Sequence, residues 1–208
     1  MSTIMVFVEG GALRNKQLNI DCRRAFKVFF KKYGIADNKI KVIACGSRQF
    51  AYRDFCIEIS QAKEPKHIIL LVDSEKHVEK KHRYKPWDHF KEREGDKHWQ
   101  KPTQADDNSA QLMVQCMEAW FMADKTALKE YYKKNFKVTV LPTSQDIENI
   151  DKKILYSSLE KATKDTQKGK YSKGNHSFKI LAEINPVNVK DKSSWAERLL
   201  EHLKELCP

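Results

Sequence analysis

Two short hydrophobic runs that end in acidic residues place the strongest constraint on how this chain folds. Residues 4–8 stop at Glu9-Gly10-Gly11, and residues 68–72 stop at Asp73-Ser74-Glu75. Each run is continuous and rich in β-branched or long aliphatic residues, which is typical of a strand buried on both faces of a parallel sheet. Because such sheets carry their functional groups at the carboxyl ends of the strands, we expect the acids to meet at one edge.

Three carboxylates at neighbouring strand ends repel one another unless a cation lies between them. An acid after a strand is alternatively only a turn or cap residue, because Asp and Ser side chains form hydrogen bonds with nearby backbone amides. This alternative explains one such strand end more easily than two. Mg²⁺, or Mn²⁺ in its place, prefers carboxylate and water oxygens. We therefore predict that Glu9, Asp73 and Glu75 form a metal site.

The pattern after the first strand predicts an α/β fold. Apolar residues at three-four spacing predict helices over residues 15–33 and 50–62, with a strand over 41–45 between them. The order strand, helix, strand, helix, strand predicts a mainly parallel, Rossmann-like sheet flanked by helices, with the first and third strands close together. At 208 residues, with 40% of them hydrophobic, the chain is long enough for one such domain with elaborations.

The rest of the chain is expected to add a loop, a helix, a strand and a helical end. Periodicity fails over residues 76–108, which predicts a long basic loop that is functional or disordered. Residues 110–123 predict a helix capped by Asp107-Asn108-Ser109, and residues 138–141 predict a strand. The predicted single domain, residues 1–208, thus comprises a core (1–75 and 109–142), the loop 76–108, and a helical elaboration (143–208) interrupted by a basic loop at 168–175.

A formal net charge of +11 predicts a polyanionic partner, and nucleic acid is the partner we expect. Lysine and arginine neutralise phosphates, while aromatic rings stack on unpaired bases. Runs of charge are also common on faces that only meet solvent, so this alternative stays open. The candidate nucleic-acid-binding residues are Lys168, Lys170, Tyr171, Lys173 and His176 in one segment, and Lys80, Lys81 and Arg83 in another.

Cysteine usage and the absence of long apolar runs predict a soluble cytoplasmic protein. The five cysteines form no Cys-x-x-Cys pair and no zinc-like spacing with histidine, which favours reduced thiols. The first residues carry no basic stretch followed by a long apolar run, and no run reaches the length that spans a bilayer. We therefore expect no membrane partner.

The two strand ends together resemble the Toprim domain, which topoisomerases, primases, small ribonuclease-like proteins and nucleases of the overcoming-lysogenization-defect group share. More closely, Val8-Glu9-Gly10, residues 71–75 and residues 113–124 resemble a bacterial Toprim-like family of unassigned function, of the domain-of-unknown-function 4276 (DUF4276) type. That resemblance spans most of the chain. It implies a Toprim-like fold, Glu9 as general acid or base, and Asp73 and Glu75 as metal ligands. It also implies metal-dependent cleavage of DNA or RNA in phage defence, beside an ATPase of the structural-maintenance type.

Two residues depart from the pattern that the resemblance implies. Glu75 stands where the second acid is usually Asp, and Gln115 stands where related motifs have His, so proton transfer at that position is lost. On the predicted helix, Gln115 and Glu118 share a face, from which Glu118 could serve as a further ligand and Gln115 as a supporting neighbour. A solvated or salt-bridged Glu118 is the alternative. Gly10 and Gly11 are expected to let a metal or phosphate approach the backbone.

Three functions remain open from the sequence. The leading hypothesis is a Mg²⁺-dependent Toprim-type nuclease. The main alternative is a non-catalytic metal- or nucleic-acid-binding subunit of a defence complex. A small-molecule phosphotransferase or phosphatase is a third class, and the absence of a P-loop or a dinucleotide-binding glycine motif weakens its nucleotide-dependent forms.

Overall fold

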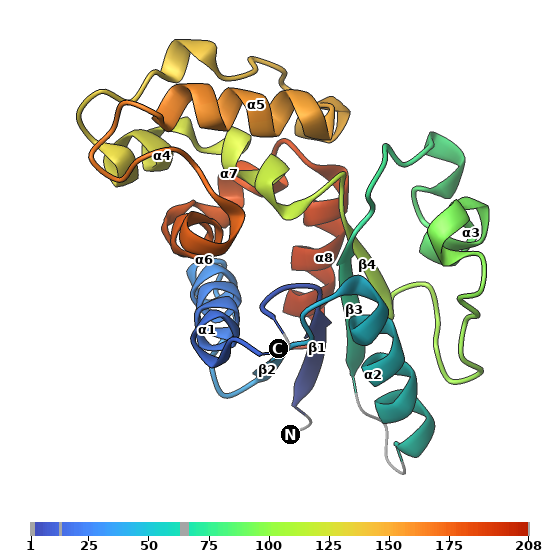
Figure 1. Cartoon of the computed structure of the whole chain (residues 1–208). Helices are drawn as coiled ribbons and strands as arrows, with labels where there is room; N and C mark the ends of the chain where they lie inside the picture. The colour runs from blue at the N-terminus through green and yellow to red at the C-terminus, as the bar shows by residue number, and fades with distance from the viewer. Residues whose placement is uncertain (1–2, 13, 63–66, 208) are drawn as a thin grey trace.

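An all-parallel, four-stranded sheet of order β2-β1-β3-β4 lies at the centre of the computed structural model, which describes residues 3–12, 14–62 and 67–207 (Figure 1). The strands are β1 (Ile4–Val8), β2 (Ile40–Ala44), β3 (Ile68–Asp73) and β4 (Ala110–Met113). β1 pairs with both β2 and β3, so that Val8 lies opposite Ala44 on one side and Leu71 on the other. The predicted α/β fold is confirmed, and the first and third strands are direct neighbours.

The first two helices form where the sequence predicts them. α1 (Lys16–Lys32) begins at Asn15, whose side chain accepts a hydrogen bond from the amide of Leu18. Gly34, with a φ of 96°, follows the end of α1 in the left-handed conformation that glycine adopts without strain. α2 (Arg48–Gln61) begins in the same way at Ser47. The other helices are α3 (Pro86–Glu92), α4 (Lys125–Tyr132), α5 (Lys152–Thr163), α6 (Lys173–Glu183), α7 (Pro186–Lys190) and α8 (Ser194–Glu205).

Alternate residues of the strands feed two hydrophobic clusters, one on each face of the sheet. Val6 and Val8 pack with α1 and the C-terminal helices, whereas Phe7 and Leu70 pack with α2 and with residues 78–105. All six residues of β3 are buried. Burial on both faces explains why the strands appear in the sequence as continuous hydrophobic runs.

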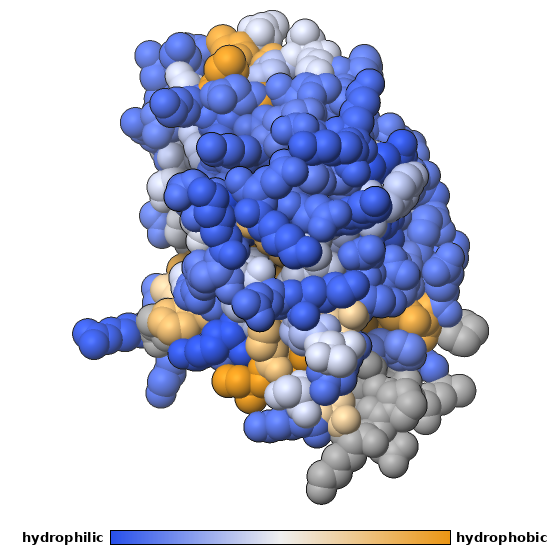
Figure 2. Space-filling model, turned by 90° about the vertical axis from the view of Figure 1, so that its right-hand side faces the viewer, coloured by the Kyte–Doolittle hydropathy of each residue, from blue (hydrophilic) through white to orange (hydrophobic). Residues whose placement is uncertain are grey.

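Residues 76–108 form a folded insert, so the expectation of an irregular loop was wrong. The insert contains the 3-10 turns η1 (Lys80–His82) and η2 (Glu94–Asp96) on either side of α3. Trp87, Phe90 and Trp99 are buried between the insert and the sheet. The face of the molecule on the side of α3 is largely hydrophilic (Figure 2). Helical periodicity is invisible here because none of these helical elements exceeds seven residues.

The predicted helix over residues 110–123 is also wrong. Residues 110–113 form β4, and after a short turn residues 117–123 form the 3-10 helix η3 (Met117–Ala123). Both segments are fully buried, and complete burial removes the alternation that distinguishes a strand from a helix. The predicted strand at 138–141 is instead a 3-10 turn, η4 (Val138–Val140), whose β-branched side chains face solvent.

The C-terminal part is helical, as predicted, and it covers one face and one edge of the sheet (Figure 1). A short 3-10 turn, η5 (Ile147–Asn149), precedes α5. α6 already begins at Lys173, so the end of the predicted 168–175 loop is helical. Arg198 of α8 donates to the carbonyl oxygen of Ala110 and to the side chain of Gln111, which protects the outer edge of β4.

No helix in the described ranges is long and apolar enough to cross a membrane. All five cysteines are free thiols, as the sequence predicts. The expectation that the chain has no leader rests in part on Met1 and Ser2. These two residues lie outside the described residues.

Trp99 is the anchor of the insert, which leads to a test of its folding role. It is 1% exposed, stacks on Tyr52 with ring centroids 4.3 Å apart, and donates from Nε1 to Gln49. We expect Trp99→Ala to lower the free energy of unfolding by about 3–5 kcal/mol, the usual cost of deleting a buried aromatic. Denaturant unfolding measures this value.

Tyr84 of the same insert provides the matched control because it is 62% exposed. Tyr84→Ala should change the free energy of unfolding by no more than about 0.5 kcal/mol. Equal effects of the two substitutions would show that the insert does not depend on its buried aromatic contacts.

Candidate metal centre

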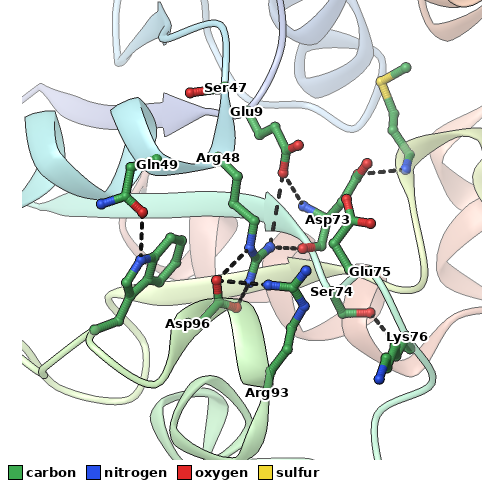
Figure 3. A network of polar contacts seen from close by, with 12 residues as sticks. Glu9, Ser47, Arg48, Gln49, Asp73, Ser74, Glu75, Lys76, Arg93 and Asp96 are labelled. Carbon is green, nitrogen blue, oxygen red and sulfur yellow. Dashed lines mark hydrogen bonds and ion pairs between the residues drawn. The ribbon is translucent and has the colours of Figure 1, made fainter.

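Glu9, Asp73 and Glu75 converge at the carboxyl ends of β1 and β3 (Figure 3). One oxygen from each carboxylate lies within 4.8 Å of the others, which is close enough for a single metal ion. The backbone pairing of the two strands creates this convergence, because the amide of Glu9 donates to the carbonyl oxygen of Leu71. The sequence therefore predicts correctly which acids meet.

Asp73 is the most buried member of the group, with 2% of its surface exposed. Its Oδ1 accepts a hydrogen bond of 2.8 Å from the amide of Met117, and its own amide donates to Oε2 of Glu9 at 3.1 Å. Burial and then the nearby charge of Glu9 raise the pKa of Asp73 to about 8. The positive groups of the protein therefore do not fully neutralise the negative charge around Asp73.

Glu9 lies at the mouth of the group, where 18% of its side chain is exposed. Burial raises the pKa of Glu9, and the repulsion from Glu75 acts in the same direction. The charge of Arg48, with Nη1 3.9 Å from Oε2, and the hydrogen bond from Asp73 oppose that increase. The net result is that the pKa of Glu9 lies above that of an ordinary glutamate.

Glu75 is held in the turn after β3 by its backbone and by a lysine. It has a positive φ of 66°, and its amide donates to the carbonyl oxygen of Gln115 at 2.9 Å. Lys152 of α5 contacts Oε2 of Glu75 at 2.8 Å. Gln115 therefore supports the site through its backbone, while its side chain donates to the carbonyl oxygen of Glu148.

Lys173, the first residue of α6, brings a second ammonium group to the acids. Its Nζ lies 3.6 Å from Oδ2 of Asp73 and 3.9 Å from Oε2 of Glu118. Although burial acts to lower it, the pKa of Lys173 is raised by Asp73, Glu118 and Glu9. The side chain of Lys173 remains 55% exposed and is therefore accessible to a ligand.

Glu118 lies behind Lys173, outside the group of three converging carboxylates. It is fully buried in η3 and accepts hydrogen bonds of 2.9 Å from the hydroxyls of Tyr156 and Tyr171. Burial and the charge of Glu118 raise the pKa of both tyrosines, so they remain protonated donors. Gln115 and Glu118 do not share a helix face, because a turn and not a helix connects them.

Arg48 and its support from the insert are features of the site that the sequence interpretation missed. The guanidinium of Arg48 donates to the carbonyl oxygen of Asp73 and forms two hydrogen bonds with Asp96, at 3.2 and 2.5 Å (Figure 3). Asp96 also pairs with Arg93 at 2.8 Å, and the rings of Phe90 and Trp99 flank the guanidinium. The position of Arg48, at the start of α2 and four residues after the end of β2, was the available signal, whereas nothing in the sequence links it to Asp96.

A pocket of about 210 Å³ opens beside Glu9 and Asp73. Its lining residues are Glu9, Gly10, Gly11, Leu18, Gly46, Asp73, Met117, Lys173, Gly174, Ser177 and Phe178. Gly11 has a φ of 85°, and a Cβ at this residue would lie 2.1 Å from Oδ1 of Asn19. A Cβ on Gly10 would lie 3.1 Å from the ring of Phe178. Both glycines are therefore required by close packing next to Glu9.

The candidate nucleic-acid-binding residues near α6 have different surroundings. Lys173 lies against the carboxylates, whereas Lys170 pairs with Glu160 at 2.8 Å and Lys168 lies over the ring of Tyr131. Tyr171 and His176 are buried, so their rings support the interior of the site and do not present a stacking face to solvent.

The second basic segment lies on the insert. Lys80 begins η1, Lys81 pairs with Glu79 and Glu92, and Arg83 lies over the ring of Tyr84. Figure 1 places α3 and α6 on opposite sides of the sheet. The two basic segments are thus separate surfaces, and the acids lie at the carboxyl ends of the two inner strands, β1 and β3.

A family model described as "Domain of unknown function (DUF4276)" matches residues 20–204. The matched range contains Asp73, Glu75, Glu118 and Lys173, and it begins after Glu9. Comparison with curated proteins and with solved structures gave no match.

The raised pKa of Asp73 leads to a prediction about metal binding. A bound cation requires Asp73 to be ionised, so we expect Mg²⁺ affinity to increase roughly tenfold per pH unit from pH 6 towards 8. Without metal, protonation of Asp73 favours the folded state. This contribution to the free energy of unfolding is complete below the ordinary pKa of 3.8 and is lost as the pH rises through about 8. Calorimetric titration at several pH values measures the first effect, and Asp73→Asn should abolish it. A pH-independent affinity would contradict this assignment.

Lys173 should substitute for part of the missing positive charge when no metal is bound. We expect Lys173→Gln to lower the unfolding midpoint of the metal-free protein by up to about 3 °C and to increase the stabilisation by Mg²⁺. Thermal unfolding with chelator and with Mg²⁺ gives both values. Lys170→Gln is the control and should change neither value, because Lys170 lies in the preceding loop and, among the described residues, pairs with Glu160 and not with the acids of the site.

Proposed function

Because the chain belongs to the DUF4276 family, whose description names no activity, we propose its function from the site: metal-dependent cleavage of phosphodiester bonds in DNA or RNA by a Toprim-type nuclease. The observation that carries the proposal is the convergence of Glu9, Asp73 and Glu75 at the ends of two adjacent parallel strands. Acids in this position can bind a metal and exchange a proton within one small volume.

The donor set fits a hard divalent cation. All three side chains offer carboxylate oxygens, which suit Mg²⁺ or Mn²⁺ better than a thiophilic metal. The raised pKa of Asp73 reflects burial and the charge of Glu9, and a cation would relieve that repulsion. When bound, such an ion polarises a phosphate oxygen and stabilises the leaving oxygen. Asp73 and Glu75 would hold it.

Glu9 is proposed as the general acid or base. Its Oε2 accepts the amide of Asp73 and faces Arg48, whereas the described residues give Oε1 no hydrogen bond. This oxygen can therefore hold or release a proton at a phosphodiester. Arg48 is fixed by Asp96 and by two aromatic rings, so it keeps Glu9 oriented and limits the rise in the pKa of Glu9.

Two lysines provide positive charge for a phosphate. Lys173 is half-exposed beside Asp73, and Lys152 lies beside Glu75. A phosphate that approaches Asp73 would meet the ammonium group of Lys173 first, because the side chain of Lys173 is 55% exposed and that of Asp73 is 3% exposed. The net charge of +11 further favours a polyanionic substrate, for which Lys168, Lys170, Lys80, Lys81 and Arg83 provide possible contacts along the surface.

The resemblance to Toprim nucleases of the overcoming-lysogenization-defect group supports a role in phage defence together with an ATPase of the structural-maintenance type. This partner is proposed by analogy with those proteins. A non-catalytic subunit that binds metal or nucleic acid has the same acids and lysines but no turnover, and a small-molecule phosphatase has turnover on free nucleotides alone. Both are distinguishable outcomes of the cleavage test.

We expect Glu9→Gln to lower the cleavage rate by about 10²–10⁴-fold, the usual contribution of a general acid or base. Binding of nucleic acid should change little, because the substitution preserves size and hydrogen bonding. Cleavage of labelled single-stranded DNA, duplex DNA and RNA with Mg²⁺, Mn²⁺ or chelator measures the rate, and the ATPase partner is added where one is encoded nearby.

Asp37→Asn is the matched control, because Asp37 is an exposed acid paired with Lys31 at 3.3 Å. This variant should cleave at the natural rate. Cleavage that persists in chelator, or in both Glu9→Gln and Asp73→Asn, would refute a metal-dependent nuclease at this site.

A further inference from the structure

The pocket beside Glu9 and Asp73 extends the proposed function to its substrate. We infer that this pocket holds one unpaired base of the nucleic acid, next to the phosphate at which the metal-binding acids act, so that the protein acts on unpaired strands. The inference rests on the proposed nuclease function for the identity of the ligand, but its test measures binding.

The position of the pocket connects it to the chemistry. Glu9, Asp73 and Lys173 form its polar end, and Leu18, Met117 and Phe178 contribute its apolar wall. Met117 connects the two parts, because its amide donates to Asp73 and the residue lines the pocket. A phosphate held at the acids would therefore place the adjoining nucleoside against an apolar surface.

The polar groups of the walls are largely used within the protein. Gly10 and Gly46 exchange backbone hydrogen bonds of 3.0 and 2.8 Å, and the hydroxyl of Ser177 donates to the carbonyl oxygen of Lys173. The walls thus offer contact with a ring face and few groups that read base edges. Contact of this kind tolerates any base, because every base has an apolar face.

The size of the pocket limits its ligand to a single ring system. Its volume of about 210 Å³ is below the ~300 Å³ at which pockets for whole drug-sized molecules begin. A paired and stacked base cannot enter without leaving the duplex, which costs free energy that an unpaired base does not require. Preference for unpaired strands follows from this difference.

Gly174 allows the pocket to be filled without disturbing the acids. It lines the pocket in the first turn of α6, and a Cβ at this residue meets nothing within 4 Å. Gly174→Leu therefore adds an apolar side chain where there is open space, and leucine favours the helix more than glycine does. Asn175→Leu is the matched control, because Asn175 is the exposed next residue of α6 and lies outside the pocket lining.

The experiment measures the affinity of the natural protein and both variants for a short single strand, for the same sequence as a duplex, and for single strands with one abasic residue at successive positions. Ca²⁺ replaces Mg²⁺ so that binding is measured without relying on turnover. We expect the single strand to bind at least tenfold more tightly than the duplex. One abasic position should lose about 5- to 100-fold, the worth of one base contact.

Gly174→Leu should reduce single-strand affinity by the same factor and should abolish the penalty at that abasic position, while Asn175→Leu behaves as the natural protein. Equal binding of single strand and duplex, or an abasic penalty that persists in Gly174→Leu, would overturn the inference. A correctly folded Gly174→Leu protein retains its pH-dependent metal binding. If the natural protein shows this binding pattern but never cleaves, the nuclease proposal fails while the base pocket stands.

Discussion

Repulsion among carboxylates at the ends of β1 and β3 is the constraint on which the rest of this structure depends. Glu9, Asp73 and Glu75 are drawn together by the pairing of two strands, and burial makes the ionisation of Glu9 and Asp73 costly. Each acid accordingly has at least one cation or amide beside it. Arg48 faces Glu9, the amide of Met117 contacts Asp73, and Lys152 contacts Glu75.

These partners come from segments added around the sheet. The insert provides Asp96, which fixes Arg48, while α5 provides Lys152 and α6 provides Lys173. Both additions therefore do more than cover hydrophobic surface, since each supplies charge that allows the acids to coexist. This arrangement neutralises only part of the negative charge of the group without metal, and a divalent ion would compete with lysines that can turn towards a phosphate.

Glu118 extends the same principle into the interior. A fully buried carboxylate is costly unless it is paired, and here two tyrosine hydroxyls and the ammonium of Lys173 surround it. Glu118 thereby holds Lys173 from the side opposite Asp73. Lys173 lies between two acids from different segments, which explains how a half-exposed lysine is kept at the mouth of the pocket.

The sequence by itself determined the parallel core and the three acids. Hydrophobic runs, caps and strand ends are local features, so they can be recognised without knowing which residues are neighbours in space. It did not distinguish β4 from a helix, since complete burial erases the alternation of Ala110–Met113, and it missed α3 because short helices lack periodicity. Only the tertiary structure decided that Asp96 supports Arg48, that Tyr171 faces Glu118, and that Lys173 reaches Asp73. Those contacts join residues 48 to 100 positions apart, and no local pattern encodes such pairs.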